Sequence, residues 1–98
     1  MATYLLSPQA REDLLEIWQY IAIDNISAAD QLYERFYQEF KRLGEYPELG
    51  MERSDLTKAP VRFWVTDGYL TVYRVRKSQV EIIRVLSSYR DIASELGQ

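Results

Sequence analysis

Hydrophobic residues recur at helical spacing in the first half of the chain and at every second position in much of the second half. The first stripe consists of Ala10, Leu14, Ile17 and Ile21, with Trp18 beside it. This spacing predicts a helix that begins at Pro8. Ser7 is expected to cap it, because serine caps helices well and proline favours the first helical position. The short apolar segment TYLL, residues 3–6, is expected to form a strand before it.

A second helix is predicted from Ser27 to about Tyr46. Ser27 with Asp30 three residues later resembles a capping box. The apolar face of this helix is expected to hold Ala29, Leu32, Tyr33, Phe36, Phe40 and Leu43. The short link between the two helices predicts an antiparallel helical hairpin. Pro47 and Gly50 are expected to stop the second helix.

From Val61 onward the apolar period is two, which is typical of strands. Three strands are expected over residues 61–66, 69–76 and 79–86, with a tight turn at Asp67-Gly68 and a short helix or loose tail at the end. The order β-α-α-β-β-β(-α) predicts an α+β fold in one domain, residues 1–98, with the N-terminal helical hairpin packed on one face of a mostly antiparallel twisted sheet. The other face is expected to be polar and free to bind a partner. Candidate positions for that face or its edges are Arg62, Trp64, Leu70, Arg74, Ile82 and Arg84.

Composition removes several kinds of chemistry. The chain contains no cysteine and no histidine, which excludes disulfides, thiolate metal sites, a Ser-His triad and a histidine general base. It also lacks a glycine-rich phosphate loop, so no metal or cofactor is expected. No apolar run approaches the length of a membrane span, and the N-terminus does not resemble a signal peptide. We therefore expect a cytoplasmic protein with no membrane partner.

Charge is distributed unevenly along the chain. Residues 1–50 carry 4 basic and 9 acidic side chains, whereas residues 51–98 carry 8 basic and 6 acidic ones. The cationic second half could meet an anionic partner or form a solvated polar face. The overall net charge of −3 argues against a dedicated nucleic-acid binder. We expect no direct sequence-specific nucleic-acid binding by this chain alone.

Three stretches, taken in order, resemble the RelE/ParE superfamily of small bacterial toxins from type II toxin-antitoxin pairs. They are LSPQAREDLLEIWQYIA, AADQLYERFYQEFKRLGEYPELG, and GYLTVYRV followed by VEIIRVLSSYRD. The resemblance spans nearly the whole chain. It implies the same helical hairpin on a twisted antiparallel sheet. RelE-like members cut messenger RNA on the ribosome, whereas ParE-like members poison DNA gyrase without a recognised catalytic centre.

Residues of the predicted strands resemble the ParE branch of the superfamily more than the RelE branch. RelE-type ribonucleases commonly read Gly-Tyr-Arg at the start of the middle strand, where this chain reads Gly68-Tyr69-Leu70. Leucine has no donor for a scissile phosphate, and losing one such contact costs about 10²–10³ in rate. The tyrosine expected six residues after Arg90 is Leu96. GYLTVYRV follows the ParE-like form, although the typical RVLH is RVLS here, with Ser87 in place of the histidine.

The resemblance implies a toxin that binds and poisons DNA gyrase and is neutralised by a cognate antitoxin in a hetero-oligomeric complex. The residues predicted to bind the target are Arg62, Trp64, Arg84, Tyr89 and Arg90, and those predicted to bind the antitoxin are Tyr20, Tyr33, Tyr37 and Tyr46. If the chain were instead a RelE-like ribonuclease, its catalytic set would be Arg62, Arg84, Tyr89 and Arg90. An inactive toxin-like partner is a third alternative. Sheet packing is the other interpretation of Trp64, and pairing with acids such as Glu81 or Asp91 is the other interpretation of Arg74 and Arg84.

Overall fold

The computed structural model describes residues 4–87 and 92–96, and its elements follow the predicted order. They are β1 (Tyr4–Leu6), α1 (Pro8–Ala22), α2 (Ile26–Glu45), the 3-10 helix η1 (Pro47–Leu49), β2 (Arg62–Thr66), β3 (Tyr69–Arg76), β4 (Gln79–Ser87) and α3 (Ile92–Glu95). The predicted α+β fold is confirmed. Of the described helices, none is both long and apolar enough to span a membrane.

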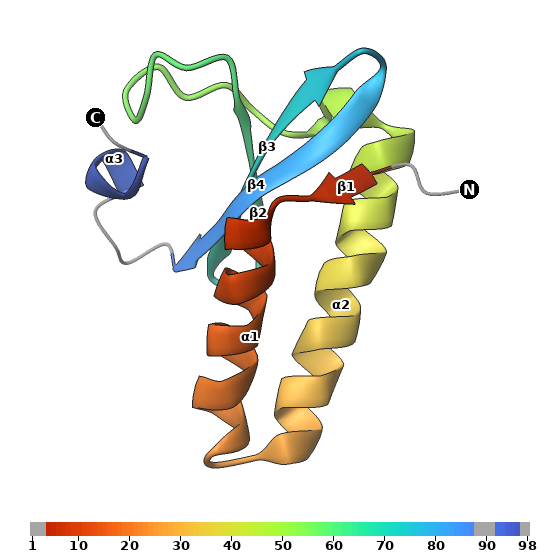
Figure 1. The fold of residues 1–98 in the computed structure, drawn as a ribbon, viewed down its shortest axis with the longest axis vertical. Helices are drawn as coiled ribbons and strands as arrows, with labels where there is room; N and C mark the ends of the chain where they lie inside the picture. The colour runs from red at the N-terminus through yellow and green to blue at the C-terminus, as the bar shows by residue number, and fades with distance from the viewer. Residues whose placement is uncertain (1–3, 88–91, 97–98) are drawn as a thin grey trace.

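The four strands form one mixed sheet in the order β1-β4-β3-β2. β1 runs parallel to β4, while β4, β3 and β2 are antiparallel neighbours. The helical hairpin packs on one face of this sheet, and the half of the hairpin that contains the α1–α2 link extends beyond it (Figure 1). A bulge interrupts the β3–β4 pairing, because Val72 faces Arg84 while Tyr73 faces Ile82. The local kink changes the direction of β4 just before its last residues.

Both helices of the hairpin, α1 and α2, have a polar N-cap, but only that of α1 is the predicted one. Ser7 accepts a hydrogen bond from the Ala10 N–H, as expected. The second helix begins at Ile26 and is capped by Asn25, whose side-chain oxygen accepts from the Ala28 N–H. The capping box predicted at Ser27 is therefore wrong, because Ser27 already lies inside α2. Asn25 and Ser27 are both residue types that cap helices well. Asn25 is the cap because its backbone is extended, as that of an N-cap residue must be.

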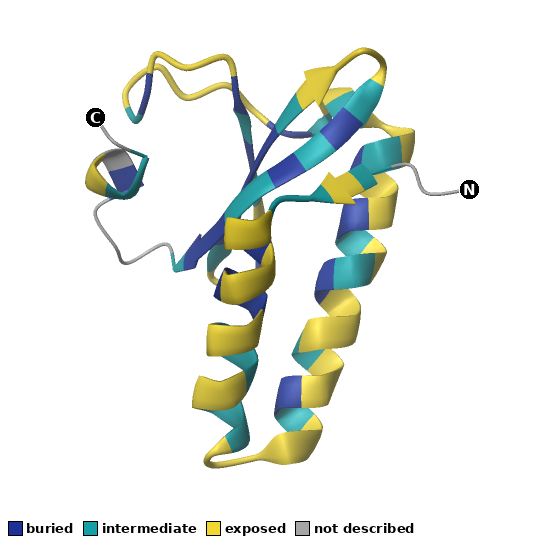
Figure 2. Cartoon of the chain, viewed as in Figure 1, coloured by how far each residue is buried: buried dark blue, intermediate teal, exposed yellow. Residues whose placement is uncertain are grey.

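The core lies between the helical hairpin and the sheet. Its buried members are Ala10, Leu14, Phe36, Phe40, Leu43, Tyr73, Val80, Ile82 and Val85. Helical stripes and alternate strand positions thus meet as the apolar pattern predicts. Figure 2 shows that buried positions on the helices lie toward the sheet, while the part of the hairpin beyond the sheet is largely exposed.

The face of the sheet away from the helical hairpin is apolar, so the expectation of a polar, free face is wrong. Leu70, Val72 and Leu86 on this face are buried together with Val61, Phe63 and Ile92. The segment after η1 contributes Leu56, and the C-terminal segment contributes Leu96. β3 is covered on both faces, so its central residues are almost continuously buried rather than alternating. Ile82, another candidate for the polar face, is buried on the helical side instead.

Candidate functional site

Arg84 and Asp13 form the most buried ion pair among the described residues. Arg84 Nε lies 2.8 Å from Asp13 Oδ2 and Arg84 Nη2 lies 3.0 Å from Asp13 Oδ1. The two side chains are only 17% and 11% exposed. The hydrogen bonds to Asp13 raise the pKa of Arg84 further above its ordinary value. Arg84 Nη2 also lies 3.7 Å from Glu95 Oε2, so one guanidinium connects α1 with α3.

This pair closes an edge of the sheet that β1 is too short to cover. β1 pairs with β4 only from Val80 to Ile82. Beyond that point, Ser7 Oγ donates to the Ile83 carbonyl at 2.6 Å, and Asp13 Oδ2 accepts from the Val85 N–H at 2.9 Å. The start of α1 therefore satisfies backbone groups that a longer strand would have paired.

Sequence reasoning did not single out Asp13, although a signal for it was present. The residue is 9% exposed and lies between Ala10 and Ile17 at helical spacing. A carboxylate inside an apolar helical stripe is unusual, because a buried charge is costly unless it is paired. Its partner, 71 positions later in the chain, could not be identified from spacing alone.

Arg62 is also bonded within the molecule. Its Nη1 donates to the Gly50 carbonyl at 2.6 Å. The neighbouring Tyr73 hydroxyl donates to the Pro47 carbonyl and accepts from the Gly50 N–H at 2.8 Å. Burial raises the pKa of Tyr73 above its ordinary value, which keeps this hydroxyl protonated. Arg62 and Tyr73 together fasten η1 and its flanking residues to the sheet.

Trp64 lies half-buried on the helical side of the edge strand β2 and packs against the main core. The guanidinium carbon of Arg42 lies 5.9 Å from the centre of its ring, within range of a cation–π contact. Its indole N–H is buried and has no hydrogen-bond partner within the described part of the chain. These contacts favour the sheet-packing interpretation of Trp64.

The residues predicted to bind the target are not brought together where the structure describes them. Arg62 lies on β2 and Arg84 on β4, with β3 between these strands, and each bonds to a different segment. Tyr89 and Arg90 fall outside the described residues. The structural role considered for Arg84 agrees with its contacts, although the acid is Asp13 rather than Glu81 or Asp91. Arg74 does pair with Glu81, at 3.1 Å.

The four tyrosines predicted to bind an antitoxin occupy three places. Tyr33 and Tyr37 are neighbours on α2, with their hydroxyl oxygens 3.3 Å apart and their ring centres 5.1 Å apart. The ring of Tyr4 on β1 lies 6.5 Å from that of Tyr37. Burial and the hydrogen bond with Tyr33 raise the pKa of Tyr37 to about 12. Tyr46 lies at the end of α2 and is 55% exposed, whereas Tyr20 lies on α1 and is 75% exposed.

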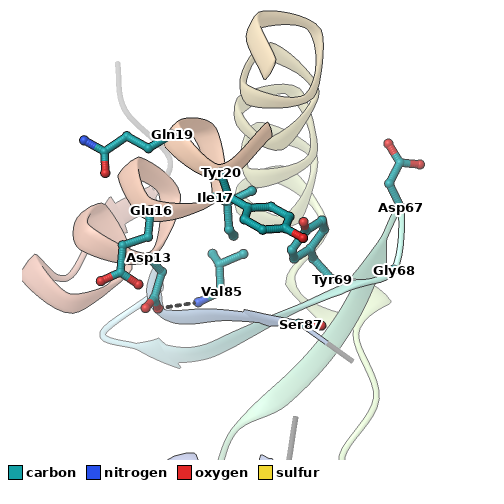
Figure 3. Close-up of a pocket in the computed structure, with 10 residues that line it drawn as sticks. All are labelled: Asp13, Glu16, Ile17, Gln19, Tyr20, Asp67, Gly68, Tyr69, Val85 and Ser87. Carbon is teal, nitrogen blue, oxygen red and sulfur yellow. Dashed lines mark hydrogen bonds between the residues drawn. The ribbon is translucent and has the colours of Figure 1, made fainter. Parts of the chain in front are cut away.

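Tyr20 borders a groove of about 760 Å³ between α1, the β2–β3 turn and the end of β4. The residues that line this groove are Asp13, Glu16, Ile17, Gln19, Tyr20, Asp67, Gly68, Tyr69, Val85 and Ser87. Figure 3 shows the rings of Tyr20 and Tyr69 close to Ile17 and Val85. Glu16 and Asp67 lie on opposite sides of the groove. An apolar floor with carboxylates at its rim fits a peptide segment that carries both apolar and basic side chains.

The described residues contain no group of three or more acidic side chains arranged to hold a metal ion. Two carboxylates that line the groove form ion pairs with arginines of the same chain. Asp13 is occupied by Arg84, and Asp67 lies 3.3 Å from the Arg35 guanidinium.

Comparisons with known proteins agree on one family. A family model described as ParE toxin of type II toxin-antitoxin system, parDE, matches residues 4–92. Toxin ParE3 of Caulobacter vibrioides is 29% identical over 87 residues, which cover 88% of this chain and 86% of that protein. A solved structure titled "Chromosomal ParDE TA system from P. aeruginosa" has a similar fold, with a TM-score of 0.71 and 20% identity, covering 89% of this chain and 96% of the matched chain.

Proposed function

The chain belongs to the family of ParE toxins of type II toxin-antitoxin systems, and on that premise we propose that it arrests growth by binding and poisoning DNA gyrase. A cognate antitoxin binds and neutralises it in a hetero-oligomeric complex. The protein acts by complementarity to its target rather than by catalysis. Inhibition requires that it bind one gyrase conformation, such as the state with cleaved DNA, better than the others. Because gyrase acts on chromosomal DNA, the proposal also places the protein in the cytoplasm.

The observation that carries this proposal is the separation of Arg62 and Arg84. Cleavage of RNA through its 2′-hydroxyl requires cations that converge on one phosphate, together with a proton acceptor and a proton donor. Here Arg62 on β2 is bonded to Gly50, and Arg84 on β4 is bonded to Asp13. These two strands are not adjacent in the sheet. Leu70, at the position where ribonucleases of the superfamily carry arginine, is buried on the far face of the sheet. This arrangement supports a binding protein over a ribonuclease.

Among the residues predicted to bind gyrase, Arg62 and Arg84 already make structural bonds, so truncating either also weakens the fold. Trp64 is partly exposed on an edge strand, and Tyr89 and Arg90 follow β4. Arginine and aromatic residues are enriched in interface hot spots. We therefore assign the contacts with gyrase chiefly to Tyr89 and Arg90, and a supporting role to Trp64 and the two bonded arginines, whose side chains also serve the fold.

The antitoxin is proposed to cover the exposed tyrosines of the helical hairpin. One part of its arm packs on Tyr33 and Tyr37, and another enters the groove beside Tyr20 and continues toward β4. Tyr46 marks the end of this path on α2. Single alanine substitutions at these positions should each weaken antitoxin binding at least tenfold if they are central contacts. Met51→Ala, at an exposed apolar residue in the segment after η1, serves as the matched control.

A plasmid supercoiling assay tests the proposed target. It contains purified DNA gyrase, relaxed plasmid, ATP and a titration of this protein freed from its antitoxin. Loss of supercoiling, or linear DNA after protein digestion, is the expected result. Adding the antitoxin should restore supercoiling. No effect at a large molar excess of the toxin would contradict gyrase as the target.

The two alternatives predict different outcomes. A ribosome-dependent ribonuclease would cleave messenger RNA on ribosomes and leave supercoiling by gyrase unchanged, and Arg90→Ala with Tyr89→Phe would abolish that cleavage while leaving antitoxin binding intact. An inactive partner would allow normal growth when the chain is expressed without an antitoxin. Growth arrest together with gyrase inhibition excludes both alternatives.

A further inference from the structure

The β3–β4 hairpin ends in a two-stranded tip, residues 74–79, that extends past its neighbouring strands. Pairing between β2 and β3 stops at Arg62 and Tyr73. Pairing between β1 and β4 begins at Val80. Between these limits, and among residues 4–87, β3 and β4 pair with each other and with no third strand. The tip is therefore a β-ribbon, and a two-stranded ribbon of this kind fits the major groove of B-form DNA, which is about 12 Å wide.

The tip carries an excess of positive charge. Arg74, Arg76 and Lys77 are close in sequence, and Glu81 is the acid that faces them among the described residues. Glu81 lies 3.1 Å from Arg74 and 3.8 Å from Arg76, so a single carboxylate is shared by two guanidiniums. The side chain of Arg76 is 60% exposed. Three cations against one anion leave a surplus of two positive charges, held on exposed side chains.

The turn of this tip keeps a lysine at a position that does not suit it. Lys77 and Ser78 have φ values of 52° and 63°, in the left-handed region. Two-residue hairpin turns of this kind favour Asn-Gly or Asp-Gly, because other residues are strained there. The other hairpin of the same sheet uses Asp67-Gly68, with φ values of 48° and 82°. A strained residue at a binding surface is a recognised pattern, since the surrounding structure compensates for its cost.

The tip lies far from the link between the two acidic helices, whereas the C-terminal end of α2 and η1 lie on the same side of the molecule as the tip (Figure 1). α1 and α2 together carry seven acidic and four basic side chains. Figure 1 places the β3–β4 turn at the opposite end of the longest axis from the α1–α2 link, and this axis measures 37 Å. Charges screen one another beyond about 10 Å at 0.1 M salt. At that salt concentration, the acidic side chains near the α1–α2 link are therefore largely screened from the tip.

From these observations we propose that the β3–β4 tip binds the phosphate backbone of duplex DNA without reading its sequence. The ribbon enters a groove, and Arg74, Arg76 and Lys77 contact phosphates on either side. The proposal rests on gyrase as the target in one respect: the DNA bound in the cell is the segment that gyrase holds. The tip then adds a DNA contact to the protein contacts of the toxin and strengthens its hold on the gyrase–DNA complex.

An NMR titration of the full chain tests this contact without gyrase. The probe is a duplex of about 12 base pairs at about 20 mM salt, where screening is weak. Amide signals of residues 74–79 should shift most. Two net positive charges correspond to a slope of about −1.8 when the logarithm of the DNA association constant is plotted against the logarithm of the salt concentration. The proposal fails if no signals shift, if the shifts map elsewhere on the protein, or if single-stranded RNA binds more tightly than the duplex.

Matched variants separate charge from backbone strain. Ser78→Gly relieves the turn and keeps the lysine, so it should raise Tm by a few degrees and leave DNA affinity unchanged. Lys77→Asn should also raise Tm, but it should halve the salt slope to about −0.9. Glu81→Gln should steepen the slope by about the same amount, because it frees both arginines. If Lys77→Asn bound DNA as tightly as Ser78→Gly, the proposal would be wrong.

The supercoiling assay then separates the proposed DNA contact of the tip from the proposal that gyrase is the target. If the wild-type chain inhibits gyrase, Arg76→Ala/Lys77→Asn should inhibit only at severalfold higher concentration and still bind the antitoxin normally. Inhibition equal to wild type would overturn the DNA contact and leave gyrase as the target. If the wild-type chain does not inhibit gyrase but its tip binds DNA in the titration, the DNA contact stands and the proposed target fails.

Discussion

Replacing Asp13 with alanine should destabilise the protein severely, because its buried carboxylate has several partners. The carboxylate accepts three hydrogen bonds, two from Arg84 and one from the Val85 N–H. Removing it leaves a guanidinium that is only 17% exposed without its main partner. It also leaves a buried backbone N–H at the open edge of β4 without an acceptor.

The magnitude follows from these two losses. Breaking a fully buried ion pair costs about 3–5 kcal/mol, and partial exposure together with the remaining acid, Glu95 at 3.7 Å, reduces this to about 2 kcal/mol. An unsatisfied buried N–H adds about 1 kcal/mol. The sum of about 3 kcal/mol corresponds to a fall in Tm of about 15 °C for a domain of this size.

Urea denaturation of a double-mutant cycle measures the pair itself. The cycle combines Asp13→Ala with Arg84→Met, which keeps the apolar stem of the arginine. We expect a coupling energy of about 2 kcal/mol. Glu12→Ala, next to Asp13 in the sequence and exposed, is the control and should change stability by less than about 0.5 kcal/mol. A cost below about 1 kcal/mol for Asp13→Ala would refute the structural role of this pair.

The same site allows stability to be separated from target binding. In Asp13→Asn/Arg84→Met the asparagine side-chain oxygen can still accept from the Val85 N–H, and no buried charge remains. This variant should fold. Gyrase inhibition at wild-type strength would show that Arg84 acts only through the fold, whereas its loss in a folded variant would assign Arg84 a direct contact.

Three further predictions concern local contacts. Gly50→Ala should cost about 2–3 kcal/mol in urea denaturation, because its Cβ would lie 2.5 Å from the buried Tyr73 ring and disturb the hydroxyl bond to the Gly50 N–H; an unchanged midpoint would contradict the close approach. Asn25→Ala should cost about 1 kcal/mol and Ser27→Ala almost nothing, and the reverse order would restore Ser27 as the cap. Tyr37 keeps its proton in the folded state up to a pKa of about 12, whereas the unfolded chain loses it near the ordinary tyrosine pKa of 10.0. Its contribution to stability is therefore complete below pH 10 and is lost as pH rises toward 12. Tyr37→Phe should therefore reduce the loss of stability at alkaline pH by about 1 kcal/mol. Urea midpoints measured on either side of this pH window test the prediction. A loss of stability as steep in the variant as in the wild type would exclude Tyr37 as its source.

Much of the fold could be predicted from the sequence because its signals are local. Ser7-Pro8 fixes the start of α1, and Asp67-Gly68 fixes the β2–β3 turn with positive φ at both residues. The helical stripes likewise identify the faces that meet the sheet. Each of these features depends on residues within one or two turns of chain, where propensity and periodicity are informative.

What the sequence could not show depends on contacts between distant segments. The pairing of Asp13 with Arg84 requires β1 to end early and β4 to bulge, and neither event has a local signature. The second apolar face was missed for a similar reason. Burial of β3 on its second face depends on Leu56 and Ile92, which come from segments distant in the sequence.

The charge asymmetry of the chain takes on a different meaning once these contacts are known. Several cations of the second half are bonded within the protein: Arg84 to Asp13, Arg62 to Gly50 and Arg53 to Asp55. Within the described residues, the surplus therefore gathers at the β3–β4 tip, while the proposed antitoxin surface lies on the helical hairpin. An antitoxin bound to the hairpin would leave the tip uncovered. Neutralisation would then have to block the contact with gyrase itself, and a toxin held by its antitoxin would retain its weak affinity for DNA.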